Sequence, residues 1–209
     1  MLIEHQGKRP NIHKSACIAS TAVICGDVTI GANTQVAFSA VISAEGGLVS
    51  IGAQSIIREN VVIRGTPGHA VQIGDYVLIG ARSALYGCSI EDEAFLATGV
   101  TIFQGARIGK GAEVRINGVV HVNSVLPESG LVPIGWIAVG NPAEVLPPGE
   151  HERIWMVQKD LNFAQTVYGV ESSPSGSSVK AENADMKEIT RRVAEGLATH
   201  RDDHILDES

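Results

Sequence analysis

Branched apolar residues recur at every sixth position along most of the chain. The positions that share this spacing are Ile18, Ile24, Ile30, Val36, Ile42, Ile51, Ile57, Ile63, Ile73, Ile79, Leu85, Ile90, Leu96, Ile102, Ile108, Val114, Val120, Leu126 and Val132. A helix repeats every 3.6 residues and a strand alternates every two, so neither element explains the pattern. A fixed period over this length indicates an internal repeat and a solenoid.

The repeat predicts an all-β solenoid over residues 10–147. Short strands of β-branched residues would stack coil on coil, each turning one apolar side chain into a narrow core. Glycines that follow several of the apolar positions, such as Gly31 and Gly80, suit corners between strands. Three hexapeptides then form one triangular turn of about 18 residues, which predicts a parallel β-helix of about 6–7 coils.

Three intervals depart from the six-residue period. Three residues are added in 42–51, four are added in 63–73, and one is missing in 85–90. In a triangular coil these intervals start at equivalent positions of successive turns, so they fall on one side of the prism. Insertions confined to one corner favour a functional site there, although tolerated surface loops remain an alternative.

The residue after each interrupted position is expected to lie at this corner. Ser43, Arg64 and Tyr86 should form a column with the strand-to-strand spacing of about 4.8 Å. The same register extends the column with Cys25 below and with Phe103 and His121 above.

The C-terminal third differs from the repeat. Residues 148–168 have apolar residues at helical spacing and predict a helix packed on the solenoid or on a neighbouring subunit. Residues 169–183 are rich in serine and predict a linker. Residues 184–200 predict an amphipathic helix, followed by an acidic end, DDHILDES. Its mixed charge favours docking on protein over a membrane anchor.

Composition narrows the function classes. The formal net charge is −7, with −2 in residues 1–147 and −5 in residues 148–209, which disfavours a nucleic-acid partner. The sequence shows neither a long apolar span nor a signal peptide, so we expect a cytoplasmic protein without a membrane partner. Cys17, Cys25 and Cys88 have no metal-binding spacing and are interpreted as buried thiols.

Four segments resemble the γ-class carbonic anhydrase-like group of the hexapeptide-repeat superfamily, which folds as a left-handed parallel β-helix. They are GDVTIG, SAVISAEGGLVSIGAQSIIRENVVIRG, IGDYVLIGARSALYGC and IAVGNPAEVLPP. In that group three histidines bind zinc between subunits of a trimer. The matching positions here hold Arg64, Ala81 and Tyr86, which do not form a zinc ligand set. The resemblance therefore implies the fold and a homotrimer. The replaced ligands predict that the chain has no zinc or other cofactor and does not hydrate carbon dioxide.

The replaced histidines leave an arginine-rich corner. Arg64 could bind a small anion bidentately in an intersubunit cleft, with Tyr86 as a hydrogen-bond donor. Five further residues are assigned to ligand binding on this hypothesis: Ser43, Glu45, Arg58, Glu59 and Arg82. An interface salt bridge that serves as subunit contact, or a pure scaffold role, is the competing interpretation, since a buried arginine needs an anionic partner.

The alternative function is an acyl-CoA-dependent acyltransferase or another enzyme without a metal. Acyltransferases of the superfamily use one histidine as a general base, and His69 in the inserted RGTPGH loop is the candidate, with His121 as a second choice. Tyr86 would be the second catalytic residue. The sequence does not decide whether the chain is an enzyme. A third hypothesis is that the protein binds a metal ion through other ligands. The histidines at 5, 13, 151, 200 and 204 are interpreted as solvated.

Overall fold

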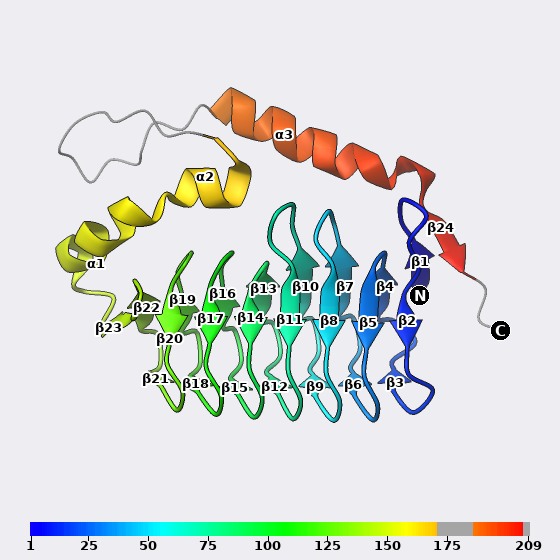
Figure 1. Cartoon of the computed structure of the whole chain (residues 1–209), viewed down its shortest axis with the longest axis horizontal. Coiled ribbons are helices and arrows are strands. Elements are labelled where there is room, and N and C mark those ends of the chain that lie inside the picture. The colour runs from blue at the N-terminus through cyan, green and yellow to red at the C-terminus, as the bar shows by residue number, and fades with distance from the viewer. Residues whose placement is uncertain (171–185, 207–209) are drawn as a thin grey trace.

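The computed structural model describes residues 1–170 and 186–206 and confirms a three-sided β-solenoid followed by helices (Figure 1). One strand from each of three sheets makes one turn, and the strands from β1 to β22 make seven complete turns and begin an eighth, slightly more than the expected 6–7, because the solenoid already starts at Leu2. The predicted linker, residues 169–183, lies outside the described residues beyond Val170.

The first sheet carries the candidate site. Its strands, in spatial order, are β23 (Glu144–Leu146), β22 (Ile137–Val139), β19 (Val119–Val120), β16 (Thr101–Ile102), β13 (Ala84–Tyr86), β10 (Val62–Gly65), β7 (Val41–Ala44), β4 (Val23–Cys25), β1 (Leu2–Glu4) and β24 (His204–Leu206). All neighbours from β1 to β22 are parallel, whereas β23 and β24 pair antiparallel at the two ends. These two strands cover edges that would otherwise expose unpaired backbone groups.

The other two sheets are entirely parallel. The second consists of β2 (Asn11–Ile12), β5 (Val28–Ile30), β8 (Val49–Ile51), β11 (Val71–Ile73), β14 (Ser89–Ile90), β17 (Arg107–Ile108) and β20 (Val125–Leu126). The third consists of β21 (Leu131–Val132), β18 (Glu113–Val114), β15 (Phe95–Leu96), β12 (Leu78–Ile79), β9 (Ile56–Ile57), β6 (Gln35–Val36) and β3 (Cys17–Ile18).

The six-residue repeat forms the core. Every apolar position that defines the repeat is buried except Ile18, which is half-buried in the first turn. Each ladder pairs these residues with their counterparts one turn away, for example Ile63 with Ile42 and with Leu85. Corner turns use left-handed backbone, and asparagine tolerates it at Asn33 and Asn60, both with φ of 58°.

The helical region differs from the expected single helix over 148–168. It contains α1 (His151–Gln158), a 3-10 turn η1 (Lys159–Leu161) and α2 (Phe163–Tyr168). Asn162 adopts left-handed φ and ψ of 49° and 56°, which ends the first segment and redirects the chain.

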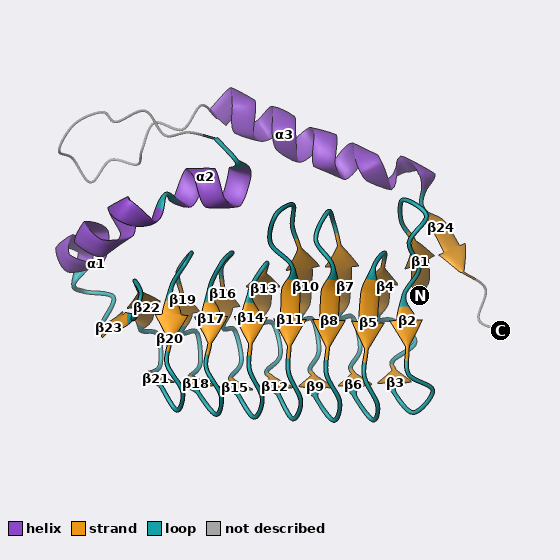
Figure 2. Ribbon diagram, in the orientation of Figure 1, coloured by secondary structure: helices purple, strands orange, loops and turns teal. Residues whose placement is uncertain are grey.

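The tail returns along the solenoid toward its N-terminal end. Helix α3 (Met186–Ala198) is followed by a 3-10 turn, η2 (Thr199–Asp202), and then by β24, so the C-terminal segment lies beside the first turn (Figure 2). Arg192 Nη1 on α3 donates a hydrogen bond of 2.5 Å to the carbonyl oxygen of Gly169, which joins α3 to the end of α2. No described helix is long and apolar enough to cross a membrane.

Candidate functional site

The predicted column at the interrupted corner is present. The register places Cys25 beside Ser43, Ser43 beside Arg64, and Arg64 beside Tyr86, on the adjacent strands β4, β7, β10 and β13. Both insertions follow this column, between β7 and β8 and between β10 and β11. The interruptions of the six-residue period thus identified a column of side chains that the structure contains.

Glu45 is the central acceptor at the lower part of this corner. Its Oε1 accepts a hydrogen bond of 2.9 Å from Ser43 Oγ and lies 3.2 Å from Arg64 Nε and 3.7 Å from His200 Nε2. Arg64 is 38% exposed, and its Nε is buried without a well-aligned hydrogen bond. Its two terminal amino groups have no partner among the described residues, so one edge of the guanidinium is free.

The inserted loop after Arg64 folds against the next turn. Thr66 and His69 pair through two backbone hydrogen bonds of 2.9 Å. His69 packs on Gly87, where an added Cβ would lie only 2.4 Å from the Cβ of His69. The side-chain atoms Thr66 Oγ1 and His69 Nδ1 are buried without hydrogen-bond partners. The loop therefore places His69 beside the residue that follows Tyr86, with an unused ring nitrogen.

The remaining candidate residues lie at a different corner of the same chain. Arg58 Nε contacts Glu59 Oε2 at 3.0 Å, and the backbone N–H of Arg82 donates to the Glu59 carbonyl oxygen at 2.9 Å. A backbone hydrogen bond at Glu59 and the neighbouring Arg58 hold the pKa of the Glu59 carboxyl below its usual value. Within one chain, then, Arg58, Glu59 and Arg82 do not join the Arg64 corner.

Aromatic rings continue the column above Tyr86. The ring centroid of Phe103 lies 6.3 Å from that of Tyr86 and 6.1 Å from that of His121. Phe163 of α2 covers both, with centroids 5.5 Å from Phe103 and 5.6 Å from His121. Burial among these rings lowers the pKa of His121 to about 4, and its Nδ1 has no hydrogen-bond partner. His121 is a packing residue here, well apart from Arg64.

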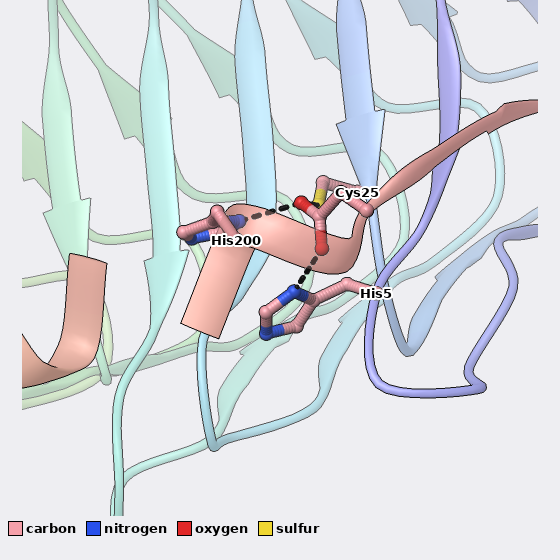
Figure 3. Close-up of side chains that lie close together, drawn as sticks. His5, Cys25 and His200 are labelled. Atoms are coloured by element: carbon pink, nitrogen blue, oxygen red, sulfur yellow. Dashed lines mark hydrogen bonds and ion pairs between the residues drawn. The ribbon is translucent and has the colours of Figure 1, made fainter. Parts of the chain in front are cut away.

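Below Ser43 the column meets a second polar cluster that sequence reasoning missed (Figure 3). Asp203 Oδ1 lies 2.6 Å from His5 Nδ1, Asp203 Oδ2 lies 2.7 Å from His200 Nδ1, and Cys25 Sγ lies 3.7 Å from Asp203 Oδ2. His5 is only 3% exposed, so the expectation that it is solvated was wrong, and His200 is half-buried. The N-terminal strand, β4 and the tail contribute one part each, and no spacing in the sequence connects them.

The electrostatics of this cluster follow from its burial. Burial, with the neighbouring Asp203 carboxylate, raises the pKa of the Cys25 thiol to about 12. Burial also opposes ionisation of Asp203, but hydrogen bonds with His200 and His5 outweigh it and hold the carboxyl pKa below its usual value. Among the other cysteines, Cys88 is buried as expected, whereas Cys17 is exposed, which corrects its interpretation as a buried thiol.

Comparison with known proteins finds sequence similarity to γ carbonic anhydrases and structural similarity to acyltransferase-like proteins. No family model matches. The chain is 27% identical over 195 residues to γ carbonic anhydrase 2, mitochondrial, of Arabidopsis thaliana, covering 88% of this chain and 68% of the relative. It is 41% identical over 91 residues to a Methanocaldococcus jannaschii protein named "Probable carbonic anhydrase", covering 44% of this chain and 57% of the relative. The chain thus spans little more than half to two thirds of these relatives.

Solved structures show the same architecture in acyl-transferring enzymes. A Bacillus cereus protein provisionally described as an acetyltransferase is 25% identical, with a TM-score of 0.53 over 76% of this chain and 90% of that one. A UDP-N-acetylglucosamine acyltransferase from Bacteroides fragilis is 19% identical, with a TM-score of 0.55 over 89% of this chain and 78% of that one, and shares the fold alone. The fold is therefore shared with acyl-transferring proteins and does not by itself identify an activity of this chain.

Proposed function

We propose that the chain is a γ-carbonic anhydrase-like homotrimer that does not use the three-histidine zinc site of that group and binds a small anion at the Arg64 corner. The single observation that carries the proposal is the free edge of the Arg64 guanidinium, because its two terminal amino groups have no partner among the described residues. Two parallel N–H donors match a carboxylate or phosphate.

The residues at the corner support an anion better than a zinc ion. The γ carbonic anhydrase resemblance aligns Arg64, Ala81 and Tyr86 with the metal-binding histidines. A guanidinium cannot donate a lone pair, alanine has no donor, and a phenol is not among the usual ligands of zinc. Among the described residues, the group of histidine, cysteine and acidic side chains close enough to hold a metal lies elsewhere. We therefore propose that the chain lacks carbonic anhydrase activity.

The surroundings of Arg64 offer further donors to an anion. Tyr86 is the next residue of the column and its hydroxyl makes no hydrogen bond within the described chain, while His69 and Thr66 have buried unpartnered atoms beside Gly87. Glu45 Oε1 forms an ion pair with Arg64, 3.2 Å from its Nε, on the side away from the two terminal amino groups. In a trimer, Arg82 and the Arg58–Glu59 pair at the other corner would belong to the neighbouring subunit's wall, which is how these residues would enter the same cleft.

An acyltransferase is the second candidate, and the unpartnered His69 Nδ1 favours it. His69 would take the proton of a hydroxyl or amine nucleophile, which attacks the thioester carbonyl of an acyl-CoA and releases the CoA thiol. The acetyltransferase likeness of the Bacillus cereus structure agrees with this chemistry. Arg64 would then orient an anionic acceptor, and Tyr86 would donate a hydrogen bond.

Calorimetric titration with malonate, phosphate and acetyl-CoA tests these proposals. Losing one charged bidentate contact of about 1.5–3 kcal/mol weakens binding by about 10- to 100-fold. We expect that loss for malonate or phosphate in Arg64→Gln and a partial loss in Arg64→Lys. The exposed Arg107→Gln, on β17 of the second sheet, is the control and should keep the affinity of the wild type. Equal affinity of Arg64→Gln and wild type would reject the anion site.

Two further readouts separate the remaining parts of the proposal. Acetyl-CoA-dependent transfer that disappears in His69→Ala would establish the acyltransferase instead of simple anion binding. Light scattering after size exclusion should give three times the chain mass, and a monomer would remove the intersubunit cleft. Fractionation of the source cells tests the proposed cytoplasmic location, since the Arabidopsis relatives are named as mitochondrial.

A further inference from the structure

The cluster below the anion site brings together four side chains of metal-binding type. His5 follows β1, Cys25 ends β4, His200 lies in η2, and Asp203 immediately precedes β24. One ligand atom from each lies within 4.8 Å of the other three, and Figure 3 shows His5, Cys25 and His200 converging on one carboxylate. His5 and Cys25 are 3% and 4% exposed, whereas the side chains of Asp203 and His200 are 15% and 28% exposed.

The donor set matches a tetrahedral divalent transition ion. Imidazole nitrogen, thiolate sulfur and a carboxylate oxygen are the donors that zinc prefers, at about 2.0–2.3 Å. Four ligands at those lengths lie about 3.3–3.8 Å from one another, by tetrahedral geometry. The 3.7 Å from Cys25 Sγ to Asp203 Oδ2 already fits, and the two histidine contacts of 2.6 and 2.7 Å must open by about 0.6–0.7 Å to reach the lower limit. The rings of His5 and His200 are stacked with centroids 4.4 Å apart, so they must also separate for both to bind one ion.

Charge balance also favours an ion of +2. A thiolate and a carboxylate together with two neutral imidazoles neutralise such an ion, leaving a buried site with no net charge. Without a metal, a buried thiol has only a weak hydrogen bond to the carboxylate. Calcium and magnesium prefer oxygen ligands and do not suit this set.

The second layer around the cluster has the arrangement expected of a metal-bound histidine. His200 directs Nδ1 to the cluster, and its Nε2 lies 3.7 Å from Glu45 Oε1. Ser43 Oγ donates to the same Glu45 oxygen, and Arg64 Nε lies 3.2 Å from it. A carboxylate on the distal nitrogen fixes the tautomer and orientation of a ligand histidine.

We propose that His5, Cys25, His200 and Asp203 bind one zinc-class transition ion, which fastens the C-terminal tail to the first turns of the solenoid. The four ligands are different residues from those of the Arg64–Tyr86 corner, although Glu45 lies between the two and contacts both His200 and Arg64. Its ligands come from both ends of the chain, so the ion closes the same edge that β24 covers by pairing with β1. The role is structural, because four protein ligands leave no open position for a substrate.

Metal content of the full-length chain tests the proposal. Tag-free protein is stripped with EDTA, reloaded with Zn²⁺ or Co²⁺ alone, dialysed and measured by mass spectrometry. We expect one ion per chain, a thiolate-to-Co²⁺ charge-transfer band, and a higher Tm on reloading. No bound ion, or no charge-transfer band, would overturn the site and leave a hydrogen-bonded cluster.

Matched variants assign the ion to these residues. Cys25→Ser and His200→Gln should lose the stoichiometric ion, whereas the exposed Cys17→Ser and His204→Gln should keep it. Glu45→Gln should weaken Zn²⁺ affinity by about 10- to 100-fold while keeping the charge-transfer band. Retention of the ion in both Cys25→Ser and His200→Gln would place it elsewhere. Metal content and the cobalt charge-transfer band report on the cluster, whereas malonate titration reports on Arg64, so failure of one proposal can be told apart from failure of the other.

Discussion

The buried His121 gives the sharpest test of how the helical region is attached. Its ring packs against Phe103 and Phe163, and burial lowers its pKa from 6.5 to about 4. The folded state therefore favours the neutral form of the His121 ring, and the unfolded chain binds a proton at a higher pH than the folded chain does. Its contribution to stability is complete above pH 6.5 and is lost as the pH falls toward 4.

The size of the effect follows from that interval. At about 1.4 kcal/mol per pKa unit, lowering the pKa from 6.5 to about 4 corresponds to about 3 kcal/mol of unfolding free energy. Replacing the ring in His121→Phe removes the titration and keeps an aromatic contact with Phe163. Between pH 7 and pH 4, the unfolding free energy of the variant should fall by about 3 kcal/mol less than that of the wild type.

Urea unfolding followed by tryptophan fluorescence measures this difference at fixed protein concentration. Other titrating groups are common to both proteins, so the comparison uses the difference between the two curves at each pH. The exposed His13→Gln serves as the control and should follow wild type. Parallel curves for His121→Phe and wild type, or an NMR titration of His121 near pH 6.5, would refute the packing argument.

Three further predictions concern the solenoid and its helical region. Ile63→Ala in the core should cost about 2–5 kcal/mol in urea unfolding, more than Ile56→Ala, which is 38% exposed. Gly65→Ala places a Cβ 2.1 Å from the Gly47 carbonyl oxygen and should lower stability by at least about 1–3 kcal/mol, whereas Gly149→Ala, with open space, should be near neutral. Asn162→Ala should cost about 1–2 kcal/mol by thermal unfolding and Asn162→Gly much less, because this residue is left-handed; equal losses would contradict that reason.

The fold could be predicted because each turn repeats the same local rule. One inward apolar residue per hexapeptide fixes the core, and register then places Ser43, Arg64 and Tyr86 in one column. The interruptions of the period identified the corner for the same reason. The sequence could not show which residues of the two corners meet within one chain, since that depends on the path of the turns and on subunit contacts.

The second cluster could not be predicted from spacing. His5 and Asp203 are separated by 198 residues and meet only because the tail returns to the first turn. The segment after α3 was interpreted as an acidic end, whereas residues His204–Leu206 form β24. The break at Asn162 was also missed, because apolar residues continue at helical spacing through it and asparagine is only a weak signal for left-handed backbone.

Anomalous X-ray diffraction from zinc-reloaded crystals soaked in malonate tests the central claim most directly. The account predicts no metal peak at the Arg64–Tyr86 corner, malonate on the free edge of Arg64, and a zinc peak among Cys25, His200 and their two partners. A zinc peak beside Tyr86 would contradict the proposed function, and an empty cluster would contradict the proposed metal site.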